Sequence, residues 1–97
     1  MPHFFVKLIP PRRSFPADTS EAEGAVMGRH AEYLRTLLAD GRGLVFGPVM
    51  DPAGVFGMGI VEAADEAAVR ALTDADPVVT EGIGRYEIFP MRLLQRG

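Results

Sequence analysis

The segment from residue 3 to residue 9, HFFVKLI, most constrains the fold, because it is apolar on both of its alternating faces. Phe4, Val6 and Leu8 fall on one side of an extended segment, and Phe5 and Ile9 fall on the other. The spacing predicts a β-strand. A strand with two apolar faces needs cover on both sides. Neither face of the sheet that contains it is therefore expected to be a polar face open to solvent.

The next segment, PPRRSFPADT at positions 10–19, has three prolines and two arginines, which predicts a loop or arm. Ser20 followed by Glu23 fits a capping box, so we expect a helix to begin near Glu21. Gly41 can end this helix, because glycine readily adopts the left-handed conformation found after helices.

A hairpin is predicted after this helix. LVFGPVMD, at 44–51, is a second strand, and its Pro48 indicates an edge position or a bulge. DPAG, at 51–54, has the chemistry of a turn, so VFGMGIVEA at 55–63 should return as the paired strand.

Asp65 can cap a second helix that runs to about Asp74. DPVVTEGIG is expected to be a turn with one helical turn, and RYEIFPMRL is the last strand. The order β-α-β-β-α-β predicts an α+β, ferredoxin-like fold: a four-stranded antiparallel sheet with two helices on one face, in a single domain spanning residues 1–97. The residues of the second helix expected to be buried are Ala68, Leu72 and Ala75.

Two helices can cover only one face of such a sheet. The third strand, like the first, has apolar side chains on both faces, with Phe56, Met58 and Ile60 on one side and Val55 and Val61 on the other. One face would therefore be a larger apolar patch than monomers usually expose. We expect this face to pack against a second copy in a symmetric homodimer. The alternative is that the long loop after the first strand covers it.

Composition excludes several classes of function. The chain has 97 residues, a net charge of −3 and no cysteine. A nucleic-acid binder should be basic, and a chain with no cysteine and two distant histidines is a poor candidate for a zinc site. We expect no cofactor and no metal. We also expect no membrane association, because no apolar run reaches the length of a membrane span. A cytoplasmic protein that binds a small molecule is the expectation.

His30 is the unusual residue of the first helix. At about 100° per residue it falls in the same apolar stripe as Val26, Leu34 and Leu37, with Tyr33 close by. A histidine in such a stripe is either a packed residue with satisfied hydrogen bonds or a base held in a pocket. The residues alone leave both roles open, and the structural role is the commoner one.

Asp76 is a candidate partner for His30. It lies in the segment DADP at the expected end of the second helix, where the helix dipole disfavours a carboxylate. It also precedes a proline, which moves it out of helical geometry and can direct its side chain inward. Both helices lie on the same face of the expected sheet, so a His30–Asp76 pair is sterically possible.

Two longer segments, GRHAEYLRTLLADGRGLVFGP and DADPVVTEGIGRYEIFPMR, resemble the YCII-related (YciI-like) family in the order and spacing of their motifs. The resemblance extends from Phe4 to about Leu93. It implies a ferredoxin-like domain that dimerises as an α+β barrel. It also implies an active-site pair of a helix histidine and an aspartate before proline, which correspond here to His30 and Asp76.

Two functions remain open. In the first, the protein is a cofactor-independent enzyme of lyase or isomerase type, in which Asp76 orients His30 as a general base for a small, aromatic molecule. Some members of the family are associated with eliminating chloride from a chlorinated aromatic. An anionic substrate would need a cation from Arg12, Arg13 or Arg85. The expected substrate-binding residues are Phe15, Tyr33, Phe46 and Phe56.

In the second, the protein is a non-catalytic homodimer that binds a small metabolite or serves as an accessory subunit. Asp76 would then only satisfy a buried histidine. A monooxygenase-like or dehydrating enzyme of the wider barrel group is a third option. Solvent access discriminates between the first two: an open cavity beside His30 favours the enzyme, and a sealed imidazole with both nitrogens bonded favours the structural role.

Overall fold

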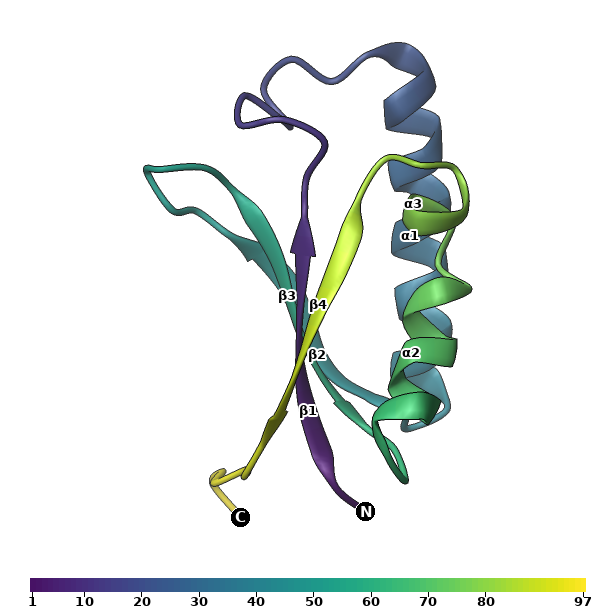
Figure 1. Ribbon diagram of the computed structural model, residues 1–97, viewed down its shortest axis with the longest axis vertical. Helices are drawn as coiled ribbons and strands as arrows, with labels where there is room; N and C mark the ends of the chain where they lie inside the picture. Colours follow the sequence, from purple (N-terminus) through teal and green to yellow (C-terminus); the bar gives the residue numbers. More distant parts are fainter.

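The computed structural model describes residues 1–97 and has the predicted ferredoxin-like element order (Figure 1). The single helical turn expected before the last strand is present as a short helix. The helices lie together on one side of the sheet, and the other side carries no helix. The elements are β1 (His3–Ile9), α1 (Glu21–Ala39), β2 (Gly43–Val49), β3 (Phe56–Glu62), α2 (Glu66–Asp74), α3 (Pro77–Thr80) and β4 (Arg85–Met91).

The strands form one antiparallel sheet in the order β2-β3-β1-β4. β1 is therefore an inner strand, paired with β3 on one side and β4 on the other. β2 is an edge strand, which explains how it accommodates Pro48, and its pairing with β3 is irregular between Gly43 and Val45. No helix of the chain is both long enough and apolar enough to cross a membrane.

The ends of α1 follow the local sequence signals. The Ser20 side chain accepts a hydrogen bond from the Glu23 amide at 3.1 Å, and the Glu23 side chain accepts one from the Ser20 amide at 2.9 Å. This is the predicted capping box. After the helix, Gly41 has a φ of +83°, a conformation that glycine adopts without strain. The predicted start and stop of α1 are confirmed.

The predicted buried face of α2 is wrong by about one residue. Val69 and Thr73 are buried, whereas Ala68 and Leu72 are only partly buried and Ala75 is exposed. The β-branched Val69 has no exposed surface and belongs to the core cluster with Phe4, Val6, Val61 and Ala63. Valine buries more apolar area than alanine, so the helix rotates to place Val69 inward.

The glycines of β3 make room for bulky neighbouring side chains. A Cβ atom built on Gly59 would overlap the ring of Phe46, and so would one built on Gly43. A Cβ atom on Gly57 would come within 3.0 Å of Leu8. Phe46 therefore fits into a notch between two glycines, and the bulky neighbour expected as the simpler explanation of these glycines is present.

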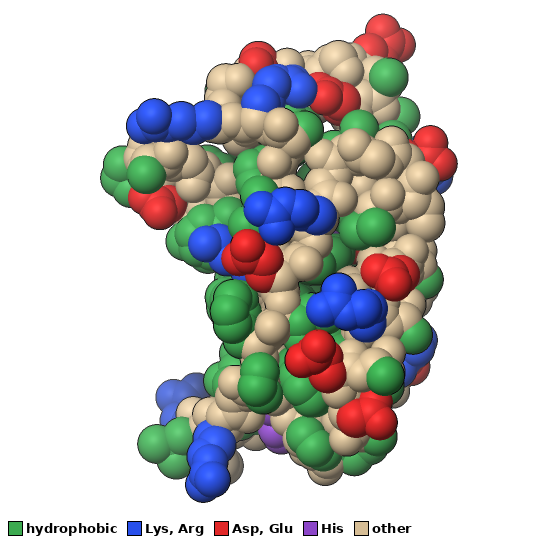
Figure 2. Space-filling model, viewed as in Figure 1, with side chains coloured by type: hydrophobic (Ala, Val, Ile, Leu, Met, Phe, Trp, Pro, Cys, Tyr) green, Lys and Arg blue, Asp and Glu red, His purple; other side chains and the backbone are tan.

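The face of the sheet opposite the helices, here called the open face, remains uncovered. Hydrophobic side chains follow the hollowed left-hand edge of the molecule in Figure 2, which corresponds to this face. On it Val45 is 46% exposed and Phe89 is 47% exposed, and the Phe5 and Phe89 rings lie 6.1 Å apart. The loop after β1 places its Phe15 on the helix side instead, so this loop does not cover the open face.

Candidate active site

His30 and Asp76 lie in direct contact, although 46 residues separate them in sequence. Nδ1 of His30 is 2.9 Å from Oδ1 and 2.8 Å from Oδ2 of Asp76. His30 faces inward from the middle of α1, which packs against α3. Asp76 is the N-cap of α3 and has no exposed surface. The structure thus brings together the two residues predicted to form a pair.

Asp76 occupies this position for a different reason from the one that its sequence suggested. Its place at the end of α2 predicted an unfavourable helix dipole. In the structure it begins α3, and its Oδ1 accepts a hydrogen bond from the amide of Val78 at 3.0 Å. Pro77 occupies the first turn of α3, where its missing N–H costs nothing. A favourable N-cap therefore holds the carboxylate that contacts His30.

Tyr86 completes the buried cluster and was missed by the sequence reasoning. Its hydroxyl donates a hydrogen bond to Oδ2 of Asp76 at 2.7 Å. Burial, and then the nearby charge of Asp76, raise the pKa of Tyr86 well above its ordinary value, so the phenol stays a donor. Alternation along β4 together with its pairing opposite Leu8 would have placed Tyr86 on the helix side, but only after the register was known.

The hydrogen bonds of Asp76 fix the role of each imidazole nitrogen. The Val78 amide and the Tyr86 hydroxyl both donate to the carboxylate, and the contact with Nδ1 places the Nδ1 hydrogen there as well. Neutral His30 then carries a lone pair on Nε2. Nε2 has no hydrogen-bond partner, and no fully buried side-chain nitrogen or oxygen lacks one, so Nε2 retains accessible surface.

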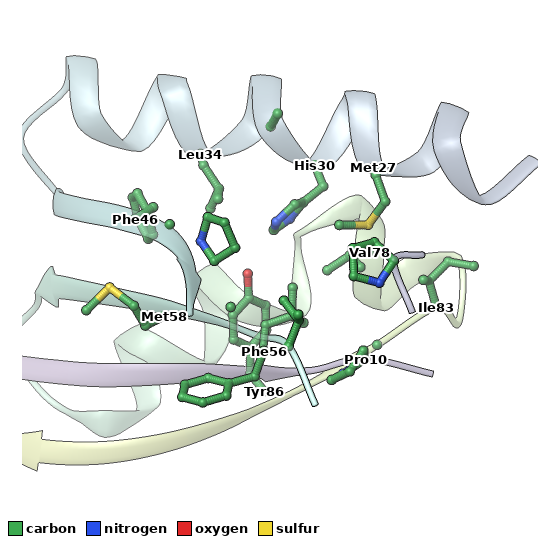
Figure 3. Close-up of a pocket in the computed structure, with 18 of the residues that line it drawn as sticks. Pro10, Met27, His30, Leu34, Phe46, Phe56, Met58, Val78, Ile83 and Tyr86 are labelled. Carbon is green, nitrogen blue, oxygen red and sulfur yellow. The ribbon is translucent and has the colours of Figure 1, made fainter. Parts of the chain in front are cut away.

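A cavity of about 330 Å³ lies between α1 and the sheet, beside His30. Figure 3 shows the imidazole pointing from α1 into this space, with the Tyr86 hydroxyl directed toward the helix from β4. Cavities that bind small molecules begin at about this size. Buried apolar groups such as Val6 and Leu8 form the floor, and the exposed Pro11, Pro16 and Pro48 lie at the rim. The imidazole is therefore not sealed.

The four aromatic residues predicted to bind substrate have different positions. Phe15 and Phe46 line the cavity, and Phe15 is 5% exposed. Phe56 also lines it, but its ring lies under Nζ of Lys7, 4.6 Å away, and β3 alternation places it on the open face. Tyr33 is not among the lining residues: its hydroxyl donates to the carbonyl of Leu72 at 2.6 Å.

The profile of the YCII-related domain matches residues 4–92, nearly the whole chain. The chain belongs to the YCII-related family. The resemblance found in the sequence is thereby confirmed. No curated protein sequence matches the chain.

Solved structures include one that this YCII-related chain resembles over its whole length. It is the 5-chloro-2-hydroxyhydroquinone dehydrochlorinase TftG from Burkholderia phenoliruptrix AC1100, in complex with 2,5-dihydroxybenzoquinone. The TM-score is 0.64 at 19% sequence identity, and the match covers 97% of this chain and 95% of that one. At this identity the likeness establishes the shared fold.

The arginines considered as anion binders in this YCII-related chain do not line the cavity. Arg12, Arg13 and Arg85 are not among the lining residues. Arg12 is fully engaged, since its guanidinium donates to Glu23 at 2.7 Å and to Asp18 at 2.9 Å. Arg85 lies 3.4 Å from Glu87. No three side chains of the His, Cys, Asp and Glu types come together as a potential metal site.

Proposed function

We propose that this protein is a cofactor-independent lyase or isomerase that acts on a small hydroxylated aromatic molecule, with His30 as general base. One observation carries the proposal: Nε2 of His30 faces a cavity and has no partner, while a fully buried Asp76 holds Nδ1. A merely structural histidine would be expected to have both nitrogens satisfied. Here the free nitrogen is the one that can accept a proton.

The cavity suits an aromatic ring. A cavity of roughly 150 Å³ can hold benzene, and the cavity beside His30 is about twice that size, with walls that are mostly hydrophobic. Phe15 and Phe46 offer aromatic surface, and rings pack well in tilted or offset arrangements. The dehydrochlorinase with the same fold, by its name, acts on a chlorinated hydroxyhydroquinone, which supports a phenolic substrate class here.

The reaction requires only proton transfers and a leaving group. His30 takes the proton of a ring hydroxyl through Nε2, and the electron pair of that O–H bond forms a carbonyl. The same proton returns to a ring carbon and gives the keto tautomer. A leaving group such as halide on that carbon then departs with its bonding electrons, while a second hydroxyl loses its proton. Asp76 stabilises the imidazolium at each stage.

His30→Ala tests this proposal. We expect turnover of chlorinated hydroxyhydroquinones, followed anaerobically by quinone absorbance and chloride release, to fall by about 10²–10⁴-fold, the usual contribution of a general base. Because the substitution enlarges an existing cavity, added imidazole should restore part of the rate. His3→Ala is the matched control, since His3 begins β1 and does not line the cavity.

Two results would contradict the proposal. One is equal turnover by the wild type and the His30→Ala variant. The other is an absence of turnover across the panel while the compounds still bind beside His30, because that result identifies the protein as a non-catalytic binder. Circular dichroism of each variant shows whether the fold survives.

A further inference from the structure

The cavity beside His30 has one formally charged side chain on its wall. Of the 22 residues that line it, Arg35 is the only one of the Lys, Arg, Asp and Glu types. Every other lining side chain is uncharged except for the titratable imidazole of His30. A single cation at the edge of an apolar cavity favours an anionic ligand over a neutral ligand of the same shape. The apolar wall does not distinguish the two.

The position of Arg35 follows from the geometry of α1. Met27, Ala31 and Arg35 are spaced four residues apart, so they form one row along the helix, and all three line the cavity. Ala31 has only a methyl group, so its side chain fills little of the space along this row. Arg35 lies at the outer end of this space, where its side chain is 66% exposed.

The present partner of Arg35 can be exchanged. Nη1 donates to Oε1 of Glu32 at 2.6 Å, but the Glu32 side chain is 73% exposed. Ion pairs between such exposed side chains contribute little to stability. Arg12, by contrast, is held by two carboxylates, and Arg42 is held by Asp40 at 2.6 Å. Arg35 lines the cavity and can turn toward a ligand without breaking a network.

We propose that Arg35 determines specificity at the mouth of the cavity by binding the carboxylate of an aromatic acid whose ring lies beside His30. The inference rests on the proposed function and adds the substrate class to it. A planar guanidinium binds a carboxylate through two parallel hydrogen bonds.

Binding of benzoate and benzamide tests the assignment, because the two probes have nearly the same shape and differ in charge at neutral pH. We expect the wild type to bind benzoate more tightly. Arg35→Gln should weaken benzoate binding about tenfold and leave benzamide binding unchanged. Arg29→Gln is the matched control, since Arg29 is an exposed arginine of α1 that does not line the cavity. NMR shifts of the lining residues report binding.

Releasing Arg35 from its present partner gives a second measurement. Glu32→Gln removes the competing carboxylate, so benzoate should bind more tightly to that variant. The proposal is overturned if benzoate causes no shift in the lining residues, if Arg35→Gln weakens both probes equally, or if Arg29→Gln has the same effect as Arg35→Gln. None of these measurements requires turnover. The preference for benzoate over benzamide can also be measured in the His30→Ala variant, which lacks the proposed base. This inference fails if Arg35 does not determine that preference, and the general-base role fails if turnover does not depend on His30.

Discussion

Tyr86 and Tyr33 differ from ordinary tyrosines in their titration, and they are the only two tyrosines of a chain without tryptophan. Burial, and then the charge of Asp76, raise the pKa of both. We expect less phenolate absorbance in the folded protein near pH 10 than two unperturbed tyrosines would give, because an unperturbed tyrosine ionises near that pH. A raised folded pKa stabilises the protein below the unfolded value, so stability should fall as the pH rises above about 10.

Near-ultraviolet absorbance across alkaline pH measures this directly. The protein unfolded in denaturant serves as the reference, because both phenols should then titrate normally. Tyr86→Phe leaves Tyr33 as the single signal and so assigns the two titrations. Ionisation of one full tyrosine near pH 10 in the folded wild type would contradict the expected shift for that residue.

The residues of the candidate site differ in how far the sequence could locate them. His30 was identified because helical periodicity places it among apolar residues. Asp76 was identified because it precedes a proline, although its role as the N-cap of α3 was not anticipated. Tyr86 and Arg35 could not be found, because each gains its role from a neighbour that is distant in sequence or from a cavity whose walls come from several elements.

At the scale of elements, the segment from residue 10 to residue 19, here called the arm, is anchored to the start of α1. Arg12 donates to Glu23 and to Asp18, and its guanidinium carbon lies 5.5 Å from the centroid of the Phe15 ring. Hydrogen bonds from Arg12 lower the pKa of Glu23 to about 2. The arm supplies Phe15 to the cavity, so its attachment affects the shape of the cavity wall.

This attachment should depend on pH. The folded pKa of Glu23 lies below its unfolded value of about 4.3, so the ion pair stabilises the attached arm above that value. The contribution is lost as the pH falls toward 2. We expect the ring shifts of Phe15 and the amide protection of the arm to decrease over that range, as followed by NMR.

Arg12→Gln should detach the arm already at neutral pH. Arg13→Gln, at an exposed neighbouring position outside the network, should leave the arm attached. Detachment of the same extent in both variants would show that general charge, rather than the Arg12 network, holds the arm.

The elements themselves were predicted well where local signals act alone. The capping box set the start of α1, and Pro48 marked β2 as an edge strand. The predicted rotation of α2 about its axis was wrong. The burial of Val69 depends on how the helix packs on the sheet, and no local pattern in a nine-residue helix specifies that packing.

At the scale of the whole molecule, the open face should join two copies. This face carries apolar side chains of β1, β3 and β4 that no other element covers. Phe89, beside Phe5, is 47% exposed. We expect sedimentation velocity at micromolar concentration to show a dimer, and Phe89→Lys to shift it to monomer because a charge would be buried without a partner. Leu38→Lys is the control, because Leu38 on α1 is similarly exposed, at 43%. A wild type that is only monomeric would contradict the expectation.

The sequence predicted the topology of the molecule because each strand and helix has its own periodicity, and few topologies connect them without crossing. The cavity could not be predicted in the same way. Its shape depends on where the arm lies, and the prolines and arginines of that segment indicated only that it is irregular. A ligand site formed partly by a loop is therefore less visible in sequence than the scaffold that supports it.

The notch that holds Phe46 influences the size of the cavity, whereas other residues carry its proposed chemistry. The ring packs over Gly43 and Gly59, while His30 and Asp76 are carried by the helices. A side chain larger than hydrogen at either glycine would displace the ring and alter the volume of the cavity, with no change to the base. Descendants of this chain could thus exchange one substrate for another by substitutions at positions that never touch it.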